Sequence, residues 1–578
     1  MTNALFSQQL LPRRRSRGVL AAAACCLVLC GQLSADDATI RAHLAAGEFG
    51  PAMQAANQVE DAKVRTELIQ EVVTAQLRAG EFDAARVATR QISEVEDRGA
   101  ARTQIAQEEA LAGGFGADFE PLMDLILNQT SGPWFDLDGV GGTMEEFESG
   151  VRVDPHGLLF RVSEKDLTGE LAALGLRARE ADLNEDMARP STLRMVSLTR
   201  LEREVAKRLE AGETVVESMR QLAGLSQIQY VFVYPEEGEI VIAGPAEGWR
   251  YNAYGMPVGR ESGRPTLQLD DLVTVMRTFS PNGERIFGCS IDPRPEGLKA
   301  IREFAEASQK EGPLSPNRVR RWAQQLGEEL GRQDVTVYGV PGDSRVARVI
   351  VEADYRMKLI GIGKMDAGPH VNSYFDLLAK NPELASGSLD ALRWWMTMQY
   401  GSVLHSEDQN AFEIRGSSVR CQSENQFLTA QGERVKTGKS EPVNQQFAAA
   451  FSEHYAELAE RDPIFADLQG VFDLALVAAM IQHDGLDRRL DWDRGVFAMN
   501  GAYRTASYAV PRETDSVVNH RVFNGRDIVV QVAGGVRADL MSVLTNSELR
   551  QQSPRLAGVA EDSKPAQLPE GRWWWDAE

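Results

Sequence analysis

The stretch ARVIVEADYRMKLIGIG, residues 347–363, decides how the centre of this chain folds. As a β-strand it would place Glu352 and Asp354 on one face, about 7 Å apart, which is within the range of paired acid catalysis. As an α-helix it has two opposed apolar stripes, and the two carboxylates point roughly 200° apart. The fold of this stretch therefore also decides whether it carries a candidate catalytic pair.

Three features favour a helix, which we expect over residues 345–360. A strand of this length would exceed the usual range of about 3 to 10 residues. Asp343 or Ser344 can cap the helix at its start, and Gly361 stands where a helix should end. The β-branched residues of the stretch weaken helix propensity only slightly.

The predicted helix lies between two apolar layers, with Tyr355 and Met357 buried on opposite faces. Its charged residues are four positions apart and form an ion pair on each flank, Glu352 with Arg356 and Asp354 with Lys358. A flank pair is worth about 0.5 kcal/mol, so Asp354→Asn should cost little. Ala353→Asp should cost several times more, because it buries an unpaired charge. The charges therefore align the helix rather than perform chemistry.

Strand and helix patterns alternate on the amino-terminal side of this stretch. Residues 230–234 and 239–243 are rich in β-forming side chains and predict a hairpin. The segment FGCSIDPRP begins as a strand and ends at Pro295, which suits the first turn of a helix. A second strand, VTVYGV, leads into the helix of the opening stretch. These strand–helix units predict a mixed α/β core and an α+β fold class.

The carboxyl-terminal half combines strands and helices as well. The alternating segment AFEIRGSSVRCQ, residues 411–422, predicts a pair of strands. Residues 447–485 predict two helices, the second beginning at the Asp462–Pro463 cap and ending at Gly485. This second helix is apolar nearly all round and should be buried. A hairpin is expected around Asn524–Gly525.

An internal repeat marks the amino-terminal part, where AGEF at Ala46 returns at Ala79 and aligns Phe49 with Phe82 at a spacing of 33 residues. The period, the Ala-Gly turn and the aromatic anchor resemble tetratricopeptide repeats, although the early tryptophan and closing proline of those repeats are missing. We predict two helix pairs over residues 39–112, with both phenylalanines buried. So few repeats cannot stand alone, so this unit should lean on another part of the protein.

Residues 1–35 have the three parts of a cleaved export signal. RRRSR supplies the positive charge, GVLAAAACCLVLCG the short apolar run, and LSA a small-residue cleavage site after Ala35. The apolar run is too short to span a bilayer stably. We expect a soluble mature chain that begins near Asp36, lies in the periplasm or is secreted, and has no transmembrane anchor after cleavage.

Net charge limits the classes of partner, and cysteine content limits the number of disulfide bonds. The net charge is −22, and cleavage would remove four arginines and no acidic residue. Such acidity disfavours nucleic acid and anionic membrane surfaces as partners. Only Cys289 and Cys421 would remain, and we favour two separate buried thiols over one bridge.

Composition shifts divide the chain into six predicted segments. They are a signal peptide (1–35), tetratricopeptide-like helical repeats (36–116), a mixed connector (117–190), an α/β core domain (191–365), an α+β carboxyl-terminal domain (366–545) and a disordered tail (546–578). The alternative for this tail is that its three consecutive tryptophans dock on the core.

The known catalytic and ligand-binding motifs are absent or incomplete. GIGK at Gly361 resembles the end of a phosphate loop but lacks the first glycine and the Ser or Thr that ligates magnesium. Residues 134–145 resemble a calcium loop, but Trp134 occupies the first ligand position, so we favour an acidic turn. The seven histidines are scattered, so a histidine metal site would require long-range assembly, and we assign no metal ligand and no cofactor. His454 is interpreted as an interfacial histidine beside an apolar helix face.

Three long stretches resemble an exported protein family of planctomycetes whose core is known only as a domain of unknown function. They are YVFVYPEEGEIVIAGPAEGW, FGCSIDPRPEGL and VEADYRMKLIGIG. The resemblance covers roughly residues 118–535 and also includes FEPLMDLILNQT and WFDLDGVGGTMEEF. It implies an envelope or secreted location. It supplies neither an activity nor a catalytic residue.

Two functional interpretations remain open. The first is a non-enzymatic scaffold or binding module of the cell envelope, which contacts another envelope protein through its helical repeats. The second is a hydrolase-type enzyme with an unfamiliar site at strand ends, where α/β sheets tend to place ligands. The candidate residues for that site are Cys289, Asp292 and Asp343.

Overall fold

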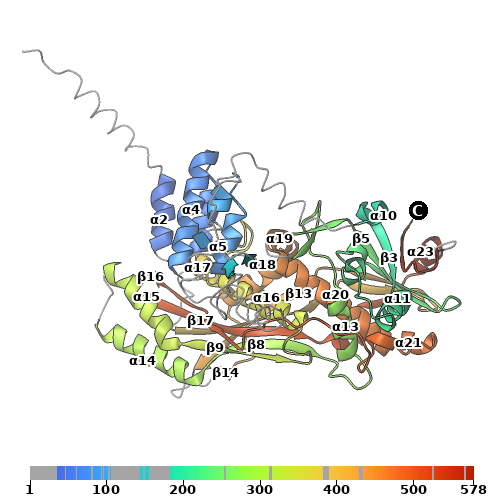
Figure 1. Cartoon of the computed structure of the whole chain (residues 1–578). Coiled ribbons are helices and arrows are strands. Elements are labelled where there is room, and N and C mark those ends of the chain that lie inside the picture. The colour runs from blue at the N-terminus through green and yellow to red at the C-terminus, as the bar shows by residue number, and fades with distance from the viewer. Residues whose placement is uncertain are drawn as a thin grey trace, which may run out of the picture.

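The computed structural model (Figure 1) describes residues 35–45, 47–59, 61–79, 82–92, 94, 97–101, 104–105, 143–147, 150–154, 183–252, 256–311, 316–381, 389–428, 434–523, 526–564 and 568–577. Two large sheets and many helices give the α+β fold that the sequence predicts. The predicted signal peptide up to Ser34 and the start of the calcium-like segment, Trp134 to Gly142, lie outside the described residues.

The larger sheet has eight strands. Its order is β14 (Arg434–Lys436), β13 (Ser418–Leu428), β10 (Leu389–Gln399), β17 (Arg526–Ala538), β8 (Phe287–Pro293), β9 (Arg332–Tyr338) and β15 (Glu513–Asp515), and β16 (Val518–Phe523) also pairs with β17. The β10–β17 pair is parallel, and the other pairs are antiparallel. The β16–β17 pair is the hairpin predicted around residues 524–525, although those two residues themselves lie outside the described part.

The second sheet has seven strands and lies at the other end of the molecule in Figure 1. Its order is β18 (Arg550–Gln552), β11 (Ser402–His405), β12 (Ala411–Arg415), β4 (Tyr230–Tyr234), β5 (Glu239–Ala246), β3 (Ser191–Ser197) and β19 (Trp574–Asp576). The β4–β5 hairpin confirms the prediction. Two small hairpins complete the strands, β1 (Thr143–Phe147) with β2 (Gly150–Asp154) and β6 (Trp249–Tyr251) with β7 (Pro257–Gly259).

Both large sheets mix strands from the two predicted domains, 191–365 and 366–545. In the eight-stranded sheet β8 and β9 lie between β17 and β15, and in the seven-stranded sheet β12 pairs with β4. One apolar cluster runs through both parts. The predicted boundary at residues 365–366 is therefore wrong. The predicted strand pair over 411–422 is corrected too, because β12 and β13 enter different sheets.

Helices cover the sheets and join them. In the core these are α11 (Leu198–Glu210), α13 (Leu269–Thr278), α16 (Arg345–Gly361) and α20 (Pro463–His483). The others after residue 183 are α10 (Glu185–Ala188), α12 (Glu217–Arg220), α14 (Pro295–Glu311), α15 (Pro316–Leu330), α17 (Tyr374–Lys380), α18 (Pro442–Glu453), α19 (Tyr455–Arg461), α21 (Leu486–Arg489), α22 (Leu540–Leu544) and α23 (Arg555–Asp562).

The opening stretch is the helix α16, as predicted. The side chain of Ser344 caps it by accepting a hydrogen bond from the backbone N–H of Ala347. Gly361 is its last residue, and a Cβ there would lie 2.0 Å from the ring of Trp394, so this position must be small. The left-handed conformation that follows the helix belongs to Gly363, with φ +75°. Strand geometry, and with it a carboxylate pair, is excluded.

The flanks of α16 differ from the prediction. Met357 is buried, but Tyr355 is only partly buried. The two predicted ion pairs form, yet Asp354 and Lys358 are both 0 % exposed. This flank is covered because α16 packs on β8 and β17, and the Nζ of Lys358 donates to the carbonyl oxygen of Ile291 at 3.3 Å. The pair is therefore a core pair rather than a surface pair.

Helix α20 begins at its predicted cap, where Asp462 accepts a hydrogen bond from the N–H of Ile464. It ends before Gly485, which takes the left-handed conformation at φ +64°. Among the described residues it is the one helix long and apolar enough to cross a membrane. The burial predicted for this helix is confirmed, since 94 % of the apolar window is buried and the helix packs against α13, α16 and α19.

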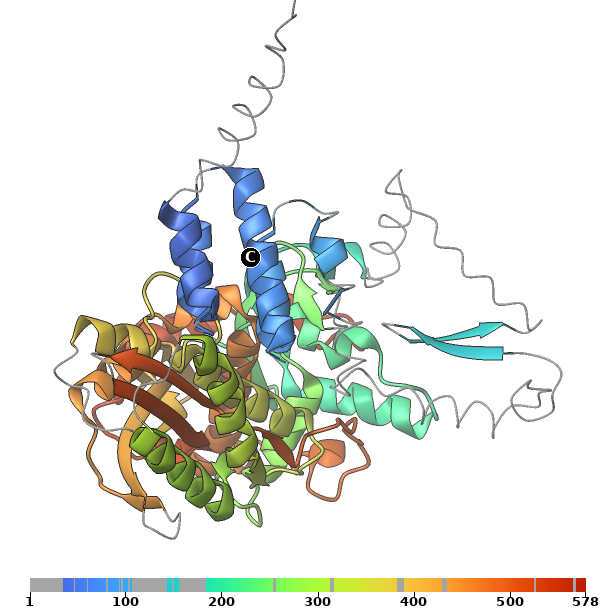
Figure 2. The same ribbon diagram turned by 90° about the vertical axis from the view of Figure 1, so that its left-hand side faces the viewer.

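The described amino-terminal residues include the helices α2 (Ala35–Ala45), α3 (Phe49–Asn57), α4 (Ala62–Arg78) and α5 (Phe82–Thr89), and residues 97–101 and 104–105 are helical as well. The long blue helices of this part stand upright on the rest of the protein in Figure 2. Helices α3 and α5 both begin at the repeated phenylalanine. Phe49 is buried as predicted, whereas the side chain of Phe82 lies outside the described part. We call these four helices the helical unit.

The helical unit packs against the core. Such packing was expected, because a unit with so few repeats is not stable alone. The carboxylate of Glu48 pairs with the guanidinium of Arg521 on β16. The N–H of Gly50 donates to the carbonyl oxygen of Gly363 at 2.8 Å. Ala84 and Val87 of α5 belong to the large apolar cluster of the core. The helical unit therefore keeps an apolar cluster of its own and joins the core through α5 and these polar contacts.

The carboxyl-terminal residues fold onto the second sheet, which corrects the predicted tail over 546–578. Strand β19 pairs with β3, and Trp573, Trp574 and Trp575 are buried. The fully buried guanidinium of Arg194 pairs with the carboxylate of Asp576 at 2.8 Å. The segment is polar in composition, which suggested disorder, but burial of its tryptophans stabilises a short strand there.

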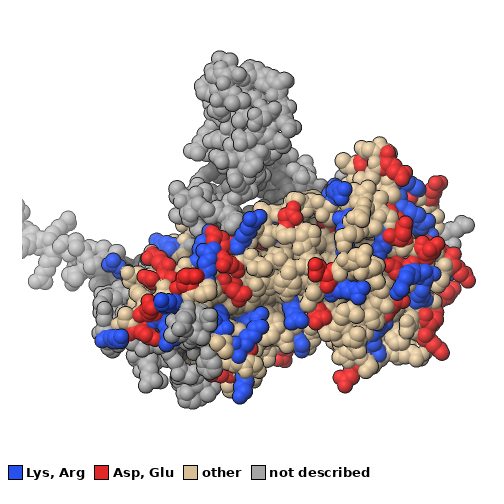
Figure 3. Space-filling model, turned by 90° about the horizontal axis from the view of Figure 1, so that it is seen from below, with Lys and Arg blue, Asp and Glu red and all other residues tan. Residues whose placement is uncertain are grey.

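Charges are locally paired on the surface. Figure 3 shows one face on which acidic and basic side chains are interspersed around a largely uncharged central area. Near the edge of the eight-stranded sheet, Arg294 and Arg332 both pair with Glu513, at 2.7 and 2.9 Å. The net negative charge of the chain therefore coexists with many local ion pairs.

Candidate functional site

A cavity of about 810 Å³ lies between the helical unit and the core. Residues from α2 and α4 line one side, and residues from α15 and β16 line the other, with Lys364 from the loop after α16. The lining residues are Leu44, Ala45, Gly47, Phe49, Glu67, Gln70, Glu71, Thr74, Ala75, Arg78, Ala79, Leu326, Lys364, Val518, Asn519 and His520. We call this the junction cavity.

Helix α4 presents one stripe of side chains to the junction cavity. Glu67, Gln70, Thr74 and Arg78 recur every three or four residues and so share a face. The opposite stripe is apolar and buried in the helical unit. Asp61 holds the start of the helix, because its carboxylate accepts hydrogen bonds from the N–H groups of Lys63 and Val64. The amphipathic pattern of α4 therefore creates one wall of the cavity.

His520 on β16 lines the core side of the cavity. Its side chain is 5 % exposed, and its Nδ1 has no hydrogen-bond partner among the described residues. Its ring meets Trp322 edge to face, with centroids 5.0 Å apart. Burial lowers the pKa of His520 to about 4, so the ring is neutral at pH 7. A buried polar atom without a partner is costly, and a bound group could satisfy it.

The positive and negative charges of the side chains around the junction cavity are equal in number. Glu67 and Glu71 face it from α4, and Arg78 and Lys364 supply two positive charges. Glu71 also pairs with Arg41 of α2 at 3.1 Å. Apolar side chains such as Phe49 and Leu326 fill much of the remaining lining. This mixture favours a neutral occupant that carries both polar and apolar groups.

An ion-pair network fixes the base of the helical unit beside this cavity. Glu48 accepts from Arg521 and lies 2.8 Å from the Nδ1 of His43. Burial raises the pKa of Glu48, but the hydrogen bonds from His43 and Arg521 outweigh burial and lower it overall. Arg521 also lies 3.4 Å from Asp376 of α17. The network therefore ties α3, β16 and α17 together.

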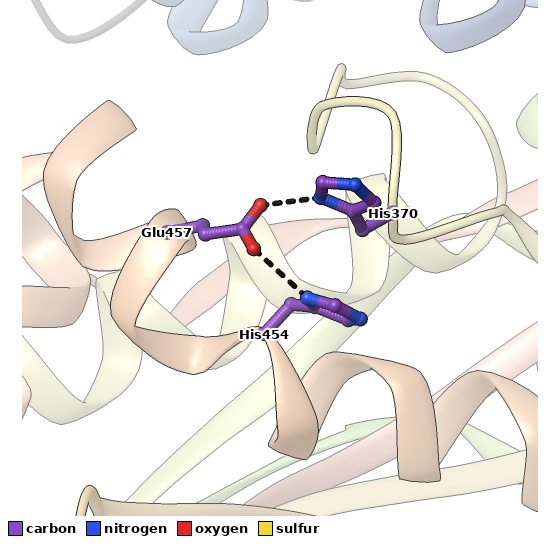
Figure 4. Close-up of side chains that lie close together, drawn as sticks. All are labelled: His370, His454 and Glu457. Carbon is purple, nitrogen blue, oxygen red and sulfur yellow. Dashed lines mark hydrogen bonds and ion pairs between the residues drawn. The ribbon is translucent and has the colours of Figure 1, made fainter.

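A second cluster joins two histidines and a glutamate (Figure 4). The Nδ1 atoms of His370 and His454 lie 2.6 and 3.0 Å from the two carboxylate oxygens of Glu457. The two rings stack with centroids 4.8 Å apart. The hydrogen bonds from the histidines lower the pKa of Glu457. Each of these three side chains offers an atom of a kind that binds metal ions, and the fold brings the three together among the described residues.

This cluster was not predicted from the sequence, for two reasons. His370 and Glu457 are 87 residues apart, so only the fold brings them together. The helix predicted from residue 447 is broken at His454 into α18 and α19, so the helical periodicity expected there does not place its side chain. The local spacing His454-x-x-Glu457 was the one signal that the sequence offered.

The three strand-end candidates do not converge. Asp292 lies opposite Asp334 on β9, whereas Asp343 follows the other end of that strand. The four residue steps from Asp334 to Tyr338 alone span about 13 Å along the strand. Cys289 is buried inside the sheet, and burial raises the pKa of its thiol well above the ordinary value. A reactive thiol requires the opposite shift.

The two cysteines are separate buried thiols, as the sequence analysis favoured. Neither is bridged to another described cysteine. The Sγ of Cys289 lies 3.5 Å from the carbonyl oxygen of Ile350, and the Sγ of Cys421 lies 3.5 Å from the Sδ of Met357. Both thiols pack against α16 and are part of the buried core.

Buried carboxylates also occur away from any cavity. Arg345 of α16 bridges Asp271 of α13 and Asp467 of α20, and burial raises the pKa of Asp271 to about 7. Asp473 accepts from Ser418 at 2.6 Å, and burial raises its pKa to about 7 as well. A shifted pKa suggests a functional group when the residue also lies in a cleft. These groups instead connect elements of the core, Asp271 and Asp467 through Arg345 between helices and Asp473 to the start of β13.

Comparison with known proteins gives one match. Residues 289–374 match the family described as a protein of unknown function (DUF1598). The matched segment runs from β8 to the start of α17 and contains α16, Lys364 and His370. No curated protein and no solved structure matches the chain. The comparison therefore identifies a domain without assigning a function to it.

Proposed function

We propose that this protein is a non-enzymatic binding module of the cell envelope and that the junction cavity binds an extended peptide segment of another envelope protein. The observation that carries the proposal is the cavity itself, which places a buried histidine with an unpartnered nitrogen opposite an amphipathic helix. Such a pocket, with a few converging polar groups among apolar ones, is typical of a ligand site.

The chemistry of the lining favours a peptide. A peptide backbone is neutral and carries both donors and acceptors, which match the neutral His520 and the side-chain amide of Gln70. Apolar side chains of the peptide would contact Phe49 and Leu326. A strongly charged ligand would meet repulsion from one half of the balanced charges around the cavity.

The helical unit and the amino-terminal segment support the location and the partner class. Tetratricopeptide-like helix pairs present concave surfaces to extended segments of other proteins. The charged start, apolar run and small-residue site of residues 1–35 support export to the periplasm or beyond. Amino-terminal sequencing of the protein from an envelope fraction should begin near Asp36, and an intact Met1 would contradict export.

A cavity-filling substitution tests the binding site. Ala75→Trp places an indole in the junction cavity, whereas Ala62→Trp places the same group at the exposed start of α4. A peptide from a partner captured with the wild-type protein should bind Ala75→Trp at least tenfold more weakly in fluorescence anisotropy. Its affinity for Ala62→Trp should be unchanged. Equal affinity for all three proteins would contradict the proposed site.

A further inference from the structure

We propose that His370, His454 and Glu457 form a binding site for a divalent transition-metal ion of the zinc class. This site is separate from the junction cavity and does not rest on the proposed peptide function. Two imidazoles and one carboxylate are a ligand set that zinc uses when a fourth position remains open.

The geometry suits an ion of this class. One ligand atom from each of the three residues can be chosen so that all lie within 4.8 Å of one another. In a tetrahedral site with metal–ligand bonds of about 2.0 to 2.1 Å, the ligand atoms lie about 3.3 Å apart. The Nδ1–carboxylate distances of 2.6 and 3.0 Å are both shorter than this separation, so the same atoms need only a small outward shift to bind an ion. An ion would replace two hydrogen bonds with three coordinate bonds.

The scaffold around the three residues is held in place. Helix α19 presents Glu457 to His370, and four residues later it presents Arg461 to Asp366 at 3.4 Å. The partners His370 and Asp366 are likewise four residues apart, so two matched contacts fix the loop against the helix. The carboxylate of Asp366 also accepts hydrogen bonds from the N–H of Gly368 at 3.1 Å and from the side-chain amide of Gln91 at 3.3 Å. A preorganised loop lowers the entropic cost of coordination.

Access and charge also fit. The side chains of His370, His454 and Glu457 are 54 %, 27 % and 43 % exposed, so an ion can enter from solvent. Neutral imidazoles and one carboxylate give the site a charge of about −1, which attracts a divalent cation. The acidic chain adds a favourable long-range field. The half-exposed His370 leaves the fourth coordination position open to water.

Metal titration of the purified full chain tests the proposal. Chelator-treated protein is dialysed against Zn²⁺ and the bound metal is quantified, and in parallel Co²⁺ is added and its visible absorption recorded. The wild type should bind one high-affinity ion per chain, and Co²⁺ should give the intense absorption of a tetrahedral site. His370→Ala and Glu457→Gln should each weaken binding at least tenfold and remove that absorption.

His483→Ala is the matched control. His483 also pairs with a neighbouring carboxylate, its Nδ1 lying 2.7 Å from Asp484, but it is outside the cluster. This variant should bind the ion like the wild type. Circular dichroism of each variant should match the wild type, because the substituted side chains are partly exposed. No bound ion in the wild type, or equal losses in all three variants, would overturn the proposal.

Discussion

The Nζ of Lys358 lies 2.6 Å from the Oδ2 of Asp354, and neither side chain reaches solvent. The pair lies at the centre of the protein, where α16 packs on the eight-stranded sheet. Burial raises the pKa of Asp354 to about 6, although Lys358 opposes the shift. The charge of each residue is therefore tolerated only because the other is present.

Asp354→Asn should be strongly destabilising. It leaves the buried ammonium of Lys358 without its counter-charge, and breaking one partner of such a pair costs about 3 to 5 kcal/mol. Urea unfolding should show this loss. Glu352→Gln is the control, because Arg356 keeps its contact with Asp462 at 2.7 Å, and it should cost about 1 kcal/mol or less. Comparable midpoints for both variants would contradict the burial of Asp354.

The helix α16 shows what local sequence signals can predict and what they cannot. Its cap, its limits and its i,i+4 partners follow from neighbouring residues, and all were predicted. The burial of Asp354 was not, because it depends on β8 and β17, which approach from distant parts of the chain. The stability cost expected from the sequence was therefore too small.

The order of the strands in the sheets was the feature least predictable from the sequence, because it depends on contacts between distant parts of the chain. Individual strands such as β4 and β8 carry clear patterns, but their neighbours are chosen by packing across hundreds of residues. The junction cavity and the His370–His454–Glu457 cluster both arise at such long-range contacts. His454 was interpreted as a residue beside an apolar helix face, and the helix break between α18 and α19 at this residue was not predicted.

Trp574→Ala should destabilise the protein although it lies four residues from the end of the chain. Trp574 is buried in β19, and the guanidinium of Arg194 stacks over its ring at 4.7 Å. Truncating a buried tryptophan costs about 3 to 5 kcal/mol. Thermal unfolding should show a clear decrease in Tm, while Glu570→Ala on the exposed approach to β19 should leave Tm unchanged. An unaltered Tm for Trp574→Ala would contradict the docking of β19 and favour the prediction of a disordered tail.

Acid should destabilise the protein partly through His520. Its pKa is about 4 in the folded protein and 6.5 in the reference state, so between these values the unfolded chain binds more protons. Stability therefore rises with pH across this window and is lost as pH falls through it, by up to about 3 kcal/mol for this group. Unfolding curves measured from pH 7 to 4 should show a shallower loss for His520→Gln than for the wild type. A parallel pH dependence in both would contradict the burial of this ring.

Arg521→Ala should loosen the helical unit without unfolding the core. The substitution leaves the buried carboxylate of Glu48 without its guanidinium partner at the junction. Hydrogen exchange should accelerate in α3 and α4 and stay unchanged in α20. Arg41→Ala removes an exposed pair within the helical unit and should have little effect. Equal exchange in α3 for both variants would show that the ion pair does not hold the junction.

Site-specific photo-crosslinking tests the binding-module proposal most directly. A photoreactive residue at Gln70 faces the junction cavity, whereas one at Lys63 lies exposed on the same helix outside it. In cells, the Gln70 probe should form an adduct with a discrete envelope protein through an extended segment of that partner, and the Lys63 probe should not. The same adduct from both positions, or none from Gln70, would contradict a peptide-binding cavity between the helical unit and the core.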